Sequence, residues 1–357
     1  MSTGGSRGPA GAVSPEPPTP DWLAPGPFLR GVAWHDRAKD RLVRADPADG
    51  DRLPWETWSR ATVPVGVRLE GLAPGADTLH IRYRAFPPRP ADELLSAGAV
   101  FELWQDGEPV CEAPARPGED RTVRLRLPAS DGPFTVHLPV PLRPRVLGLR
   151  ATGPARSAAA PAPAEPLPRW AVYGDSICEG WIASRPSRAW PAVAGRALGL
   201  DPVNLGYAGS GRGEIASAQQ LAALPCDLIT LAFGTNCWSG SPYSAPLLRE
   251  TTSAFMALVR RGHPDTPLLV LSPLLRPDAE DTPNALGATL SELRRAQEAA
   301  VADRIAAGDR GLALLSGAPL LEAADLADGL HPGDGGHARL AGAVAAALRA
   351  AGFVPLP

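Results

Sequence analysis

Two distant stretches of the sequence carry the side chains that an acyl-transfer reaction needs. Ser176 follows the apolar run 170–173 and a Gly-Asp turn, so its hydroxyl is expected where a buried strand opens into a loop. Near the other end of the chain, Asp328 precedes His331 by three residues. A serine becomes a nucleophile when an imidazole accepts its proton and a carboxylate orients the ring. Ser176, His331 and Asp328 are therefore candidate nucleophile, base and orienting acid, although Gly-Asp-Ser by itself also fits an ordinary turn.

Two further stretches offer hydrogen-bond donors for the oxyanion of such a reaction. The segment 204–210 and the tripeptide 234–236 each follow an apolar, strand-like run. The negative oxygen that develops during acyl transfer is stabilised by N–H groups aimed at it. The candidate donors are the backbone amides of Ser176 and Gly209 and the side-chain amide of Asn236.

The pattern after residue 168 explains how these stretches could meet. Apolar runs alternate with segments of helical spacing, which predicts a three-layer α/β domain with a parallel sheet. Because parallel strands end at one edge of the sheet, the polar stretches that follow them should converge there. The expected strands are 170–173, 202–205, 227–233, 268–271 and 312–315, and the expected helices are 190–198, 213–224, 247–261, 285–307 and 337–350.

The region 29–150 has a different pattern, with short alternating stretches and few helical periods. An Asp106-Gly107 pair between two apolar runs is a strong hairpin signal. This pattern predicts an all-β sandwich. His80 and His137 lie on the polar side of the alternation and are expected to face solvent. Trp34, Trp55 and Trp58 are interpreted as core residues, with a sugar-stacking platform as the alternative.

Proline, glycine and alanine mark the boundaries between these regions. Residues 1–28 are rich in Gly, Pro and Ser and are expected to be a disordered tail. Twelve of the eighteen residues in 151–168 are Ala or Pro, which predicts a linker. The expected organisation is thus a tail (1–28), an accessory sandwich (29–150), a linker (151–168) and a catalytic domain (169–357). A protein truncated to begin near Leu167 is expected to fold alone and to hydrolyse a small acetyl ester. It is expected to lose selectivity for the natural, larger substrate, because the sandwich is interpreted as a domain that helps to shape the substrate site.

Composition excludes several other classes of function. A net charge of −3 with basic and acidic residues interspersed argues against nucleic-acid binding, and no apolar run is long enough for a membrane span. No secretory signal is apparent, so a cytoplasmic location is expected. The histidines are dispersed and no CxxC pair occurs, so neither a metal nor another cofactor is expected. The four cysteines, interpreted as reduced thiols, are Cys111, Cys178, Cys226 and Cys237.

The four polar stretches together resemble the motif blocks of the GDSL, or SGNH, hydrolase family, over about residues 169–340. Gly174-Asp175-Ser176 resembles the nucleophile block, with Ile177 in place of the usual Leu. The stretch that begins at Asn204 resembles the second block, 234–236 the third, and 328–332 the last. The position of Cys237, where the family often has Asp, is a departure outside the four residues for which the family is named.

This resemblance implies a flavodoxin-like three-layer domain and a serine esterase or acylhydrolase, with Gly209 rather than Gly206 as the oxyanion glycine. The expected substrate is an O-acyl ester of a small molecule or carbohydrate. The preceding β region resembles the jelly-roll-like sandwich that accompanies such domains in some carbohydrate esterases and acyl-transferring relatives. Trp181, Trp238 and Tyr243 are candidate substrate contacts.

Two alternative functions stay open at this stage. The acyl group could pass to a hydroxyl of a natural product instead of water, or the chain could be a non-catalytic carbohydrate-binding protein. A dinucleotide loop at 206–213 is disfavoured because Glu214 stands where the third glycine is required. His337 could be a second base but is interpreted as a residue at the start of a helix. The number of subunits is left open.

Overall fold

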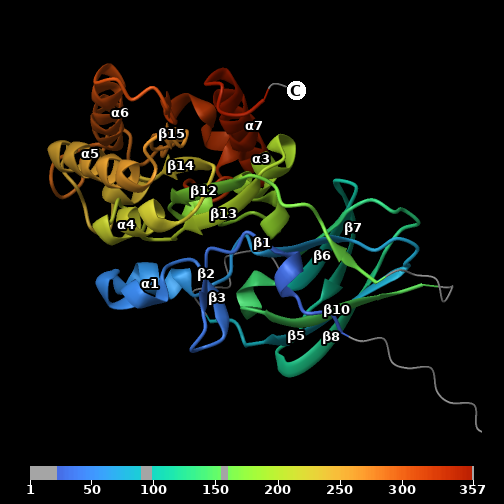
Figure 1. Ribbon diagram of the computed structural model, residues 1–357. Helices are drawn as coiled ribbons and strands as arrows, with labels where there is room; N and C mark the ends of the chain where they lie inside the picture. Colours follow the sequence, from blue (N-terminus) through green and yellow to red (C-terminus); the bar gives the residue numbers. More distant parts are fainter. Residues whose placement is uncertain (1–21, 90–98, 154–159, 356–357) are drawn as a thin grey trace, which may run out of the picture.

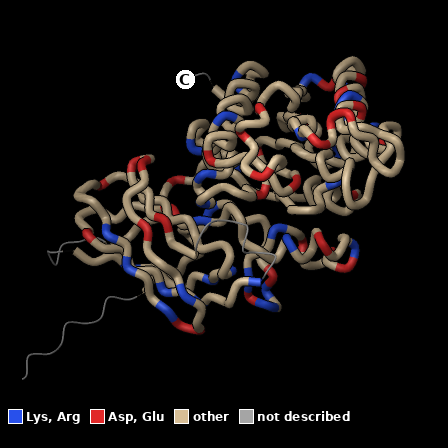
Figure 2. The backbone as a smooth tube through the Cα atoms, turned by 180° about the vertical axis from the view of Figure 1, so that it is seen from behind, with Lys and Arg blue, Asp and Glu red and all other residues tan. Residues whose placement is uncertain are grey.

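The computed structural model describes residues 22–89, 99–153 and 160–355, which form an antiparallel β sandwich and an α/β domain packed against each other (Figure 1). Basic and acidic residues are interspersed over both parts (Figure 2). No helix among the described residues is both long enough and apolar enough to cross a membrane.

Two antiparallel sheets form the sandwich and confirm the predicted all-β region. Side chains that alternate along each strand meet between the sheets, where Leu69, Ile81 and Phe101 are fully buried. The first sheet has the order β1 (Leu29–Arg30), β4 (Arg68–Leu72), β9 (Phe134–His137), β6 (Val100–Gln105), β7 (Glu108–Pro114), and β11 (Ala162–Pro163) also pairs with β4. The second has the order β10 (Arg145–Thr152), β5 (Thr78–Ala85), β8 (Gly118–Arg126).

The predicted Asp106-Gly107 turn joins β6 to β7. Asp106 has φ +54° and Gly107 has φ +81°, and Gln105 pairs with Glu108 across the turn. Two positive φ angles are the signature of the two-residue hairpin that matches the twist of its strands.

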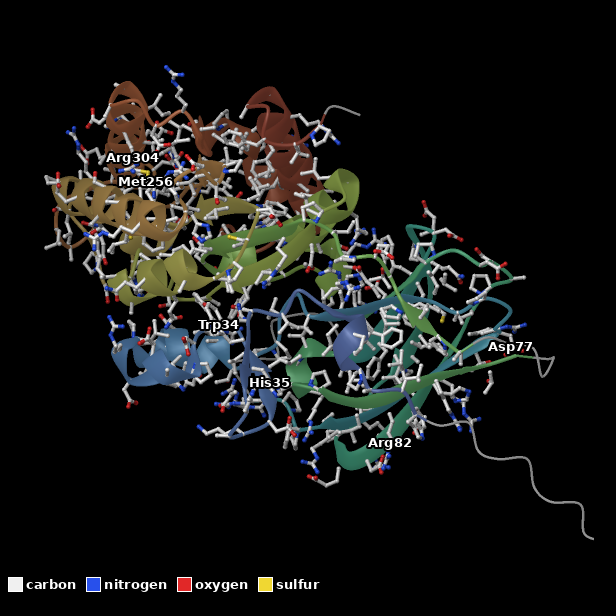
Figure 3. The ribbon with its side chains drawn as sticks, in the orientation of Figure 1. Trp34, His35, Asp77, Arg82, Met256 and Arg304 are labelled. Atoms are coloured by element: carbon white, nitrogen blue, oxygen red, sulfur yellow. The ribbon has the colours of Figure 1, made fainter. Side chains whose placement is uncertain are left out.

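A small extension of the sandwich reaches beneath the α/β domain. It consists of the hairpin β2 (Trp34–Asp36) and β3 (Arg41–Val43) and of helix α1 (Trp55–Ala61), which the sequence pattern did not predict. Trp34 lies where the two parts meet and packs against the core of the α/β domain (Figure 3). The prediction of a buried core tryptophan is wrong for Trp55, whose side chain is 74% exposed.

The predicted solvent exposure of His80 and His137 is also wrong, because both residues are buried. His137 lies edge-on to Trp104, and the guanidinium of Arg196 from the α/β domain lies 4.1 Å from the centroid of that tryptophan. Around His137 and Trp104 the outer face of the first sheet is therefore covered by the α/β domain. The alternation of polar and apolar residues along a strand identifies its two faces, but it does not show that the polar face is exposed to solvent.

The α/β domain contains the predicted five-stranded parallel sheet, in the order β13 (Asp201–Gly206), β12 (Arg169–Gly174), β14 (Leu228–Ala232), β15 (Leu268–Leu271), β16 (Leu312–Leu315). Numbered along the domain this order is 2-1-3-4-5, which is the flavodoxin-like arrangement. Helices α3 (Trp190–Leu198) and α7 (Asp334–Ala350) pack on one face. Helices α4 (Ile215–Ala223), α5 (Ala245–Gly262) and α6 (Leu290–Ala306) pack on the other. In such sheets the ligand crevice lies where the strand order reverses, here between β12 and β14.

The segments expected to be a tail and a linker lie partly outside the described residues, at 1–21 and 154–159. The described end of the tail is paired with the sandwich, since the amide of Leu23 donates to the carbonyl of Leu149 at 2.9 Å. At the two ends of the linker, β10 extends to Thr152 and β11 pairs with β4.

Candidate active site

Ser176 is the first residue of the short helix α2 (Ser176–Glu179), directly after β12. The Asp175 carboxylate caps this helix by accepting a hydrogen bond from the Ile177 amide at 3.0 Å. Gly180, with φ +96°, ends it after a single turn. The strand, the cap and the glycine together fix the hydroxyl of Ser176 at the sheet edge, where its residue is 7% exposed.

The structure brings Ser176, His331 and Asp328 together in one hydrogen-bonded chain. His331 Nε2 lies 2.9 Å from Ser176 Oγ, and His331 Nδ1 lies 2.7 Å from Asp328 Oδ2. Because a carboxylate only accepts hydrogen bonds, the proton of the neutral ring belongs on Nδ1. Nε2 then presents its lone pair to the serine hydroxyl, as a general base requires.

Asp328 is held by its own loop as well as by the imidazole. Its Oδ1 accepts hydrogen bonds from the backbone amides of His331 at 2.7 Å and Leu330 at 3.0 Å. Partial burial alone would raise the pKa of Asp328, but these bonds and the ring of His331 outweigh it and lower that pKa below its usual value. The carboxylate therefore stays ionised at neutral pH and can stabilise an imidazolium beside it.

The loops after β13 and β14 place the other candidate residues at the same edge. Gly209 lies in the first loop with φ +72°, whereas Gly206 is in β13 and donates its amide to Asn204 Oδ1 at 2.8 Å. Asn236 Nδ2 donates to the carbonyl of Ser210 at 2.6 Å, which leaves the second N–H of this amide for another acceptor. Gly211 allows the close approach of the first loop, since a Cβ there would lie 2.2 Å from the carbonyl oxygen of Gly174.

Residues 172–339 match the sequence profile of the GDSL-like lipase/acylhydrolase family. The α/β domain belongs to this family. The resemblance stated from the four motif blocks is thereby confirmed, and the domain is one that acts on acyl esters.

Solved structures resemble both parts of the chain. The salicylyl-acyltransferase SsfX3 from a tetracycline biosynthetic pathway is 26% identical over 92% of this chain and 96% of its own, with a TM-score of 0.78. A protein from Bacteroides ovatus described as a GDSL-like lipase is 20% identical over 94% of this chain and 99% of its own, with a TM-score of 0.77. A family two carbohydrate esterase from Clostridium thermocellum, solved with cellohexaose, is 15% identical over 82% of this chain and 96% of its own, with a TM-score of 0.60. A search of curated protein sequences gave no match.

Of the three candidate substrate contacts in this GDSL-type domain, Trp181 lies beside His331. Their ring centroids are 5.6 Å apart and their planes are inclined by 34°. Trp238 instead donates its indole N–H to the carbonyl of Thr282 at 2.8 Å, and Tyr243 packs against the core of the domain. Trp181 therefore packs against the candidate base, whereas Trp238 and Tyr243 make their contacts with other parts of the domain.

A buried carboxylate that the sequence analysis missed supports this edge of the sheet. The side chain of Glu179 is 0% exposed and pairs with Arg44 at 2.5 Å and with Arg60 at 3.0 Å, both from the extension of the sandwich. Its Oε2 also accepts hydrogen bonds from the indole of Trp181 at 3.2 Å and from the amide of Ala208 at 2.9 Å. Glu179 therefore contacts the residue before Gly209 and the ring that packs on His331.

His337 is a buried structural residue and does not contact Ser176. Its Nδ1 accepts from the amide of Trp190 at 3.3 Å, so its Nε2 carries the proton and donates to the carbonyl of Trp181 at 3.2 Å. Burial lowers the pKa of His337 to about 4, which keeps the ring neutral.

The thiols near the site are buried as well. Desolvation raises the pKa of Cys178 well above its ordinary value and raises that of Cys237. Both remain protonated at neutral pH and are poor nucleophiles. Among the described residues, no group of three or more His, Cys, Asp or Glu side chains is arranged to hold a metal ion.

Proposed function

We propose that the protein is a serine acyl-ester enzyme that works through an acyl-enzyme on Ser176. The observation that carries this proposal is the hydrogen-bonded chain from Asp328 Oδ2 through His331 to Ser176 Oγ, at 2.7 and 2.9 Å. The family match of residues 172–339 supports the same class of reaction.

The first half of the reaction forms the acyl-enzyme. Ser176 Oγ bonds to the acyl carbon while its proton passes to His331 Nε2, and the carbonyl electron pair moves onto the oxygen. The amides of Ser176 and Gly209 and the side-chain N–H of Asn236 stabilise that oxygen. The intermediate collapses when the bond to the alcohol breaks and the imidazolium returns its proton to the leaving oxygen.

The second half releases the acyl group to an acceptor. His331 removes a proton from the acceptor hydroxyl, which attacks the acyl carbon, and Ser176 leaves with the proton that the imidazolium gives back. Water as acceptor makes the protein an esterase, which is the function we propose first. The substrate we propose is an O-acyl ester of a small molecule or carbohydrate, in keeping with the esterases among the structural neighbours.

Transfer to a hydroxyl of a small molecule is a second candidate, favoured by one specific observation. The acyltransferase SsfX3 is similar over both the sandwich and the α/β domain, at 26% identity. Because the same acyl-enzyme serves both outcomes, the acceptor alone distinguishes them. A carbohydrate-binding role without catalysis is disfavoured by the proton-transfer distances between Ser176, His331 and Asp328.

The test is turnover of p-nitrophenyl esters of graded acyl length, with and without sugar or phenolic hydroxyl acceptors, followed by mass spectrometry of the products. Ser176→Ala is the inactive reference. Ser253→Ala, which removes a partly buried hydroxyl of α5 that donates to the carbonyl of Arg249 in the same helix, is the matched control. Free acid as the sole product identifies an esterase, whereas acylated acceptor identifies a transferase. Turnover that survives Ser176→Ala, or no turnover of any ester by the unaltered protein, would overturn the proposal.

A further inference from the structure

A second cleft lies in the sandwich, outside the residues of the candidate active site. Its volume is about 860 Å³, within the range of about 300–1,000 Å³ that small-molecule sites occupy. It is bounded by helix α1, by the hairpin β2–β3, and by residues at the ends of β5 and β10. His35, on the hairpin, lines it (Figure 3). Neither Ser176 nor His331 does.

The walls of this cleft are predominantly cationic. Six lysine and arginine side chains and one carboxylate, that of Asp40, are among the described residues that line it. Clefts with walls of one charge sign concentrate ligands of the opposite sign. The cationic residues are Lys39, Arg41, Arg84, Arg89, Arg143 and Arg145.

Ion pairs hold several of these arginines in place around the cleft. The pairs are Arg41–Asp36, Arg84–Glu119 and Arg145–Asp40. The side chains of Arg41, Arg84 and Arg145 remain partly exposed, at 33%, 38% and 39%. A planar guanidinium with exposed N–H groups can bind two oxygens of a phosphate at once.

The same cleft exposes aromatic surface that packing within the sandwich does not use. Trp55 is 74% exposed and Phe86 is 42% exposed, and both line the cleft together with Trp58. The guanidinium of Arg41 lies 5.9 Å from the centroid of the Trp58 ring. Exposed tryptophan faces and arginine planes are the groups on which flat, nitrogen-containing rings stack.

We propose that this cleft binds a phosphate ester that carries a planar ring, that is, a nucleotide-like small molecule. The arginine-rich wall binds the phosphate groups, and the ring stacks on the exposed indole of Trp55. A multiply charged phosphate fits this wall better than a singly charged aromatic carboxylate does, because several cations can share it. The proposal does not depend on the reaction proposed for Ser176.

Helix α1 connects the two sites physically. Trp55, Trp58 and Thr62 face the cleft, while Arg60 pairs with Glu179 and Thr57 contacts Ser210 in the loop after β13. A ligand in the cleft would therefore contact the helix that supports the candidate active site.

The test is isothermal titration of the full chain carrying Ser176→Ala, which removes turnover, with four probes. ADP combines ring and phosphates, adenosine has the ring alone, pyrophosphate has the charge alone, and benzoate combines a ring with a single charge. We expect saturable binding of ADP at least about tenfold tighter than that of each other probe, because only ADP combines the stacking contact with several phosphate contacts. Repeating the titration with Ser176 intact should give the same affinity for ADP.

Matched variants locate the binding. Trp55→Ala and Lys39→Gln alter exposed side chains and should each weaken ADP binding severalfold, and Arg145→Gln should do the same. Arg261→Gln changes an exposed arginine at the end of α5, far along the chain from the cleft, and should have no effect. Absence of saturable ADP binding, equal affinity for ADP and benzoate, or an equal effect of Arg261→Gln would each overturn the proposal.

Discussion

Glu179 Oε1 lies 2.5 Å from Arg44 Nη2, and the two residues belong to different parts of the molecule. Both side chains are almost fully buried, with exposures of 0% and 1%. A buried ion pair is stable only when its other hydrogen-bonding groups are also satisfied, and here Arg60, Trp181 and the amide of Ala208 complete the set around Glu179. The sandwich therefore contributes directly to the support of the helix that begins with Ser176.

Replacing Glu179 by Gln should destabilise the whole protein. The change leaves the buried guanidinium groups of Arg44 and Arg60 without their counter-charge, and breaking one side of such a pair costs about 3–5 kcal/mol. Urea unfolding at pH 7 measures this loss. Glu322→Gln is the control, since that carboxylate is 78% exposed and should change the free energy of unfolding by less than about 0.5 kcal/mol. Similar losses for the two variants would show that the Glu179 pair contributes little.

Ser176→Ala and His331→Ala should each lower kcat by about three decades or more while the fold is retained, because the nucleophile and the base act as one unit. Steady-state turnover of an activated ester measures the loss, and circular dichroism checks the fold. The double variant should be scarcely slower than either single variant. Near-full turnover by purified Ser176→Ala protein would exclude this serine as the nucleophile.

Asn236→Ala should act on the transition state rather than on substrate binding. Loss of one oxyanion donor costs roughly 10²–10³ in kcat, with little change in KM. The separate measurement of kcat and KM is decisive here. A large rise in KM at constant kcat would instead identify Asn236 as a contact of the bound substrate. Because Asn236 also donates to the Ser210 carbonyl, thermal unfolding should accompany the kinetics.

The sequence predicts the parts of this structure that depend on local pattern. Strands 268–271 and 312–315 and the helix 190–198 agree with the structure residue for residue, since an apolar run or apolar periodicity and a flanking proline or glycine mark each of them. The four motif stretches converge because parallel strands end at one sheet edge. The Glu179 cluster could not be predicted, because Arg44 and Arg60 are more than a hundred residues away in sequence and no spacing rule links them to it. The burial of His137 likewise depends on the contact between two domains.

His337 should make the free energy of unfolding depend on pH below neutrality. Burial lowers its pKa to about 4 from the ordinary 6.5 of an unfolded chain. Between these values the unfolded state binds more protons than the folded state, so the free energy of unfolding should fall as pH drops from about 6.5 to about 4 and then level off. The contribution at neutral pH is on the order of 3 kcal/mol. Burial lowers the pKa values of His80 and His137 as well, so they add to the same trend.

The variant His337→Gln isolates this part of the pH dependence. It should be less stable than the unaltered protein at pH 7, because the contacts to Trp190 and Trp181 change, but its stability should fall less steeply between pH 6.5 and 4. Urea unfolding at half-unit pH steps measures the slope. His35→Gln, at an exposed position, should leave the slope unchanged. An unchanged slope in His337→Gln would mean that other groups control the acid transition.

The last prediction concerns a protein truncated to begin at Leu167, without the sandwich. Its length alone suggests independent folding, but the interface leads to a different expectation. The cut removes Ala45, Leu53 and Ala61, which pack into the core cluster of the α/β domain. It also removes the partners of two carboxylates, because Asp201 pairs with Arg68 at 2.9 Å as Glu179 does with Arg44. Exposed apolar surface and lost ion pairs should lower the Tm markedly and reduce kcat even for a small acetyl ester.

Adding residues 22–166 as a separate chain distinguishes a structural role of the sandwich from a role in substrate selection. If the sandwich supports the α/β domain through the Glu179 and Asp201 pairs, the added chain should bind and raise both Tm and kcat on the small ester. The added chain carrying Arg44→Met should restore much less, because it cannot neutralise the Glu179 carboxylate that its docking buries. A truncated protein with the Tm and small-ester kcat of the full chain would contradict the structural role. The sandwich would then act in substrate selection alone.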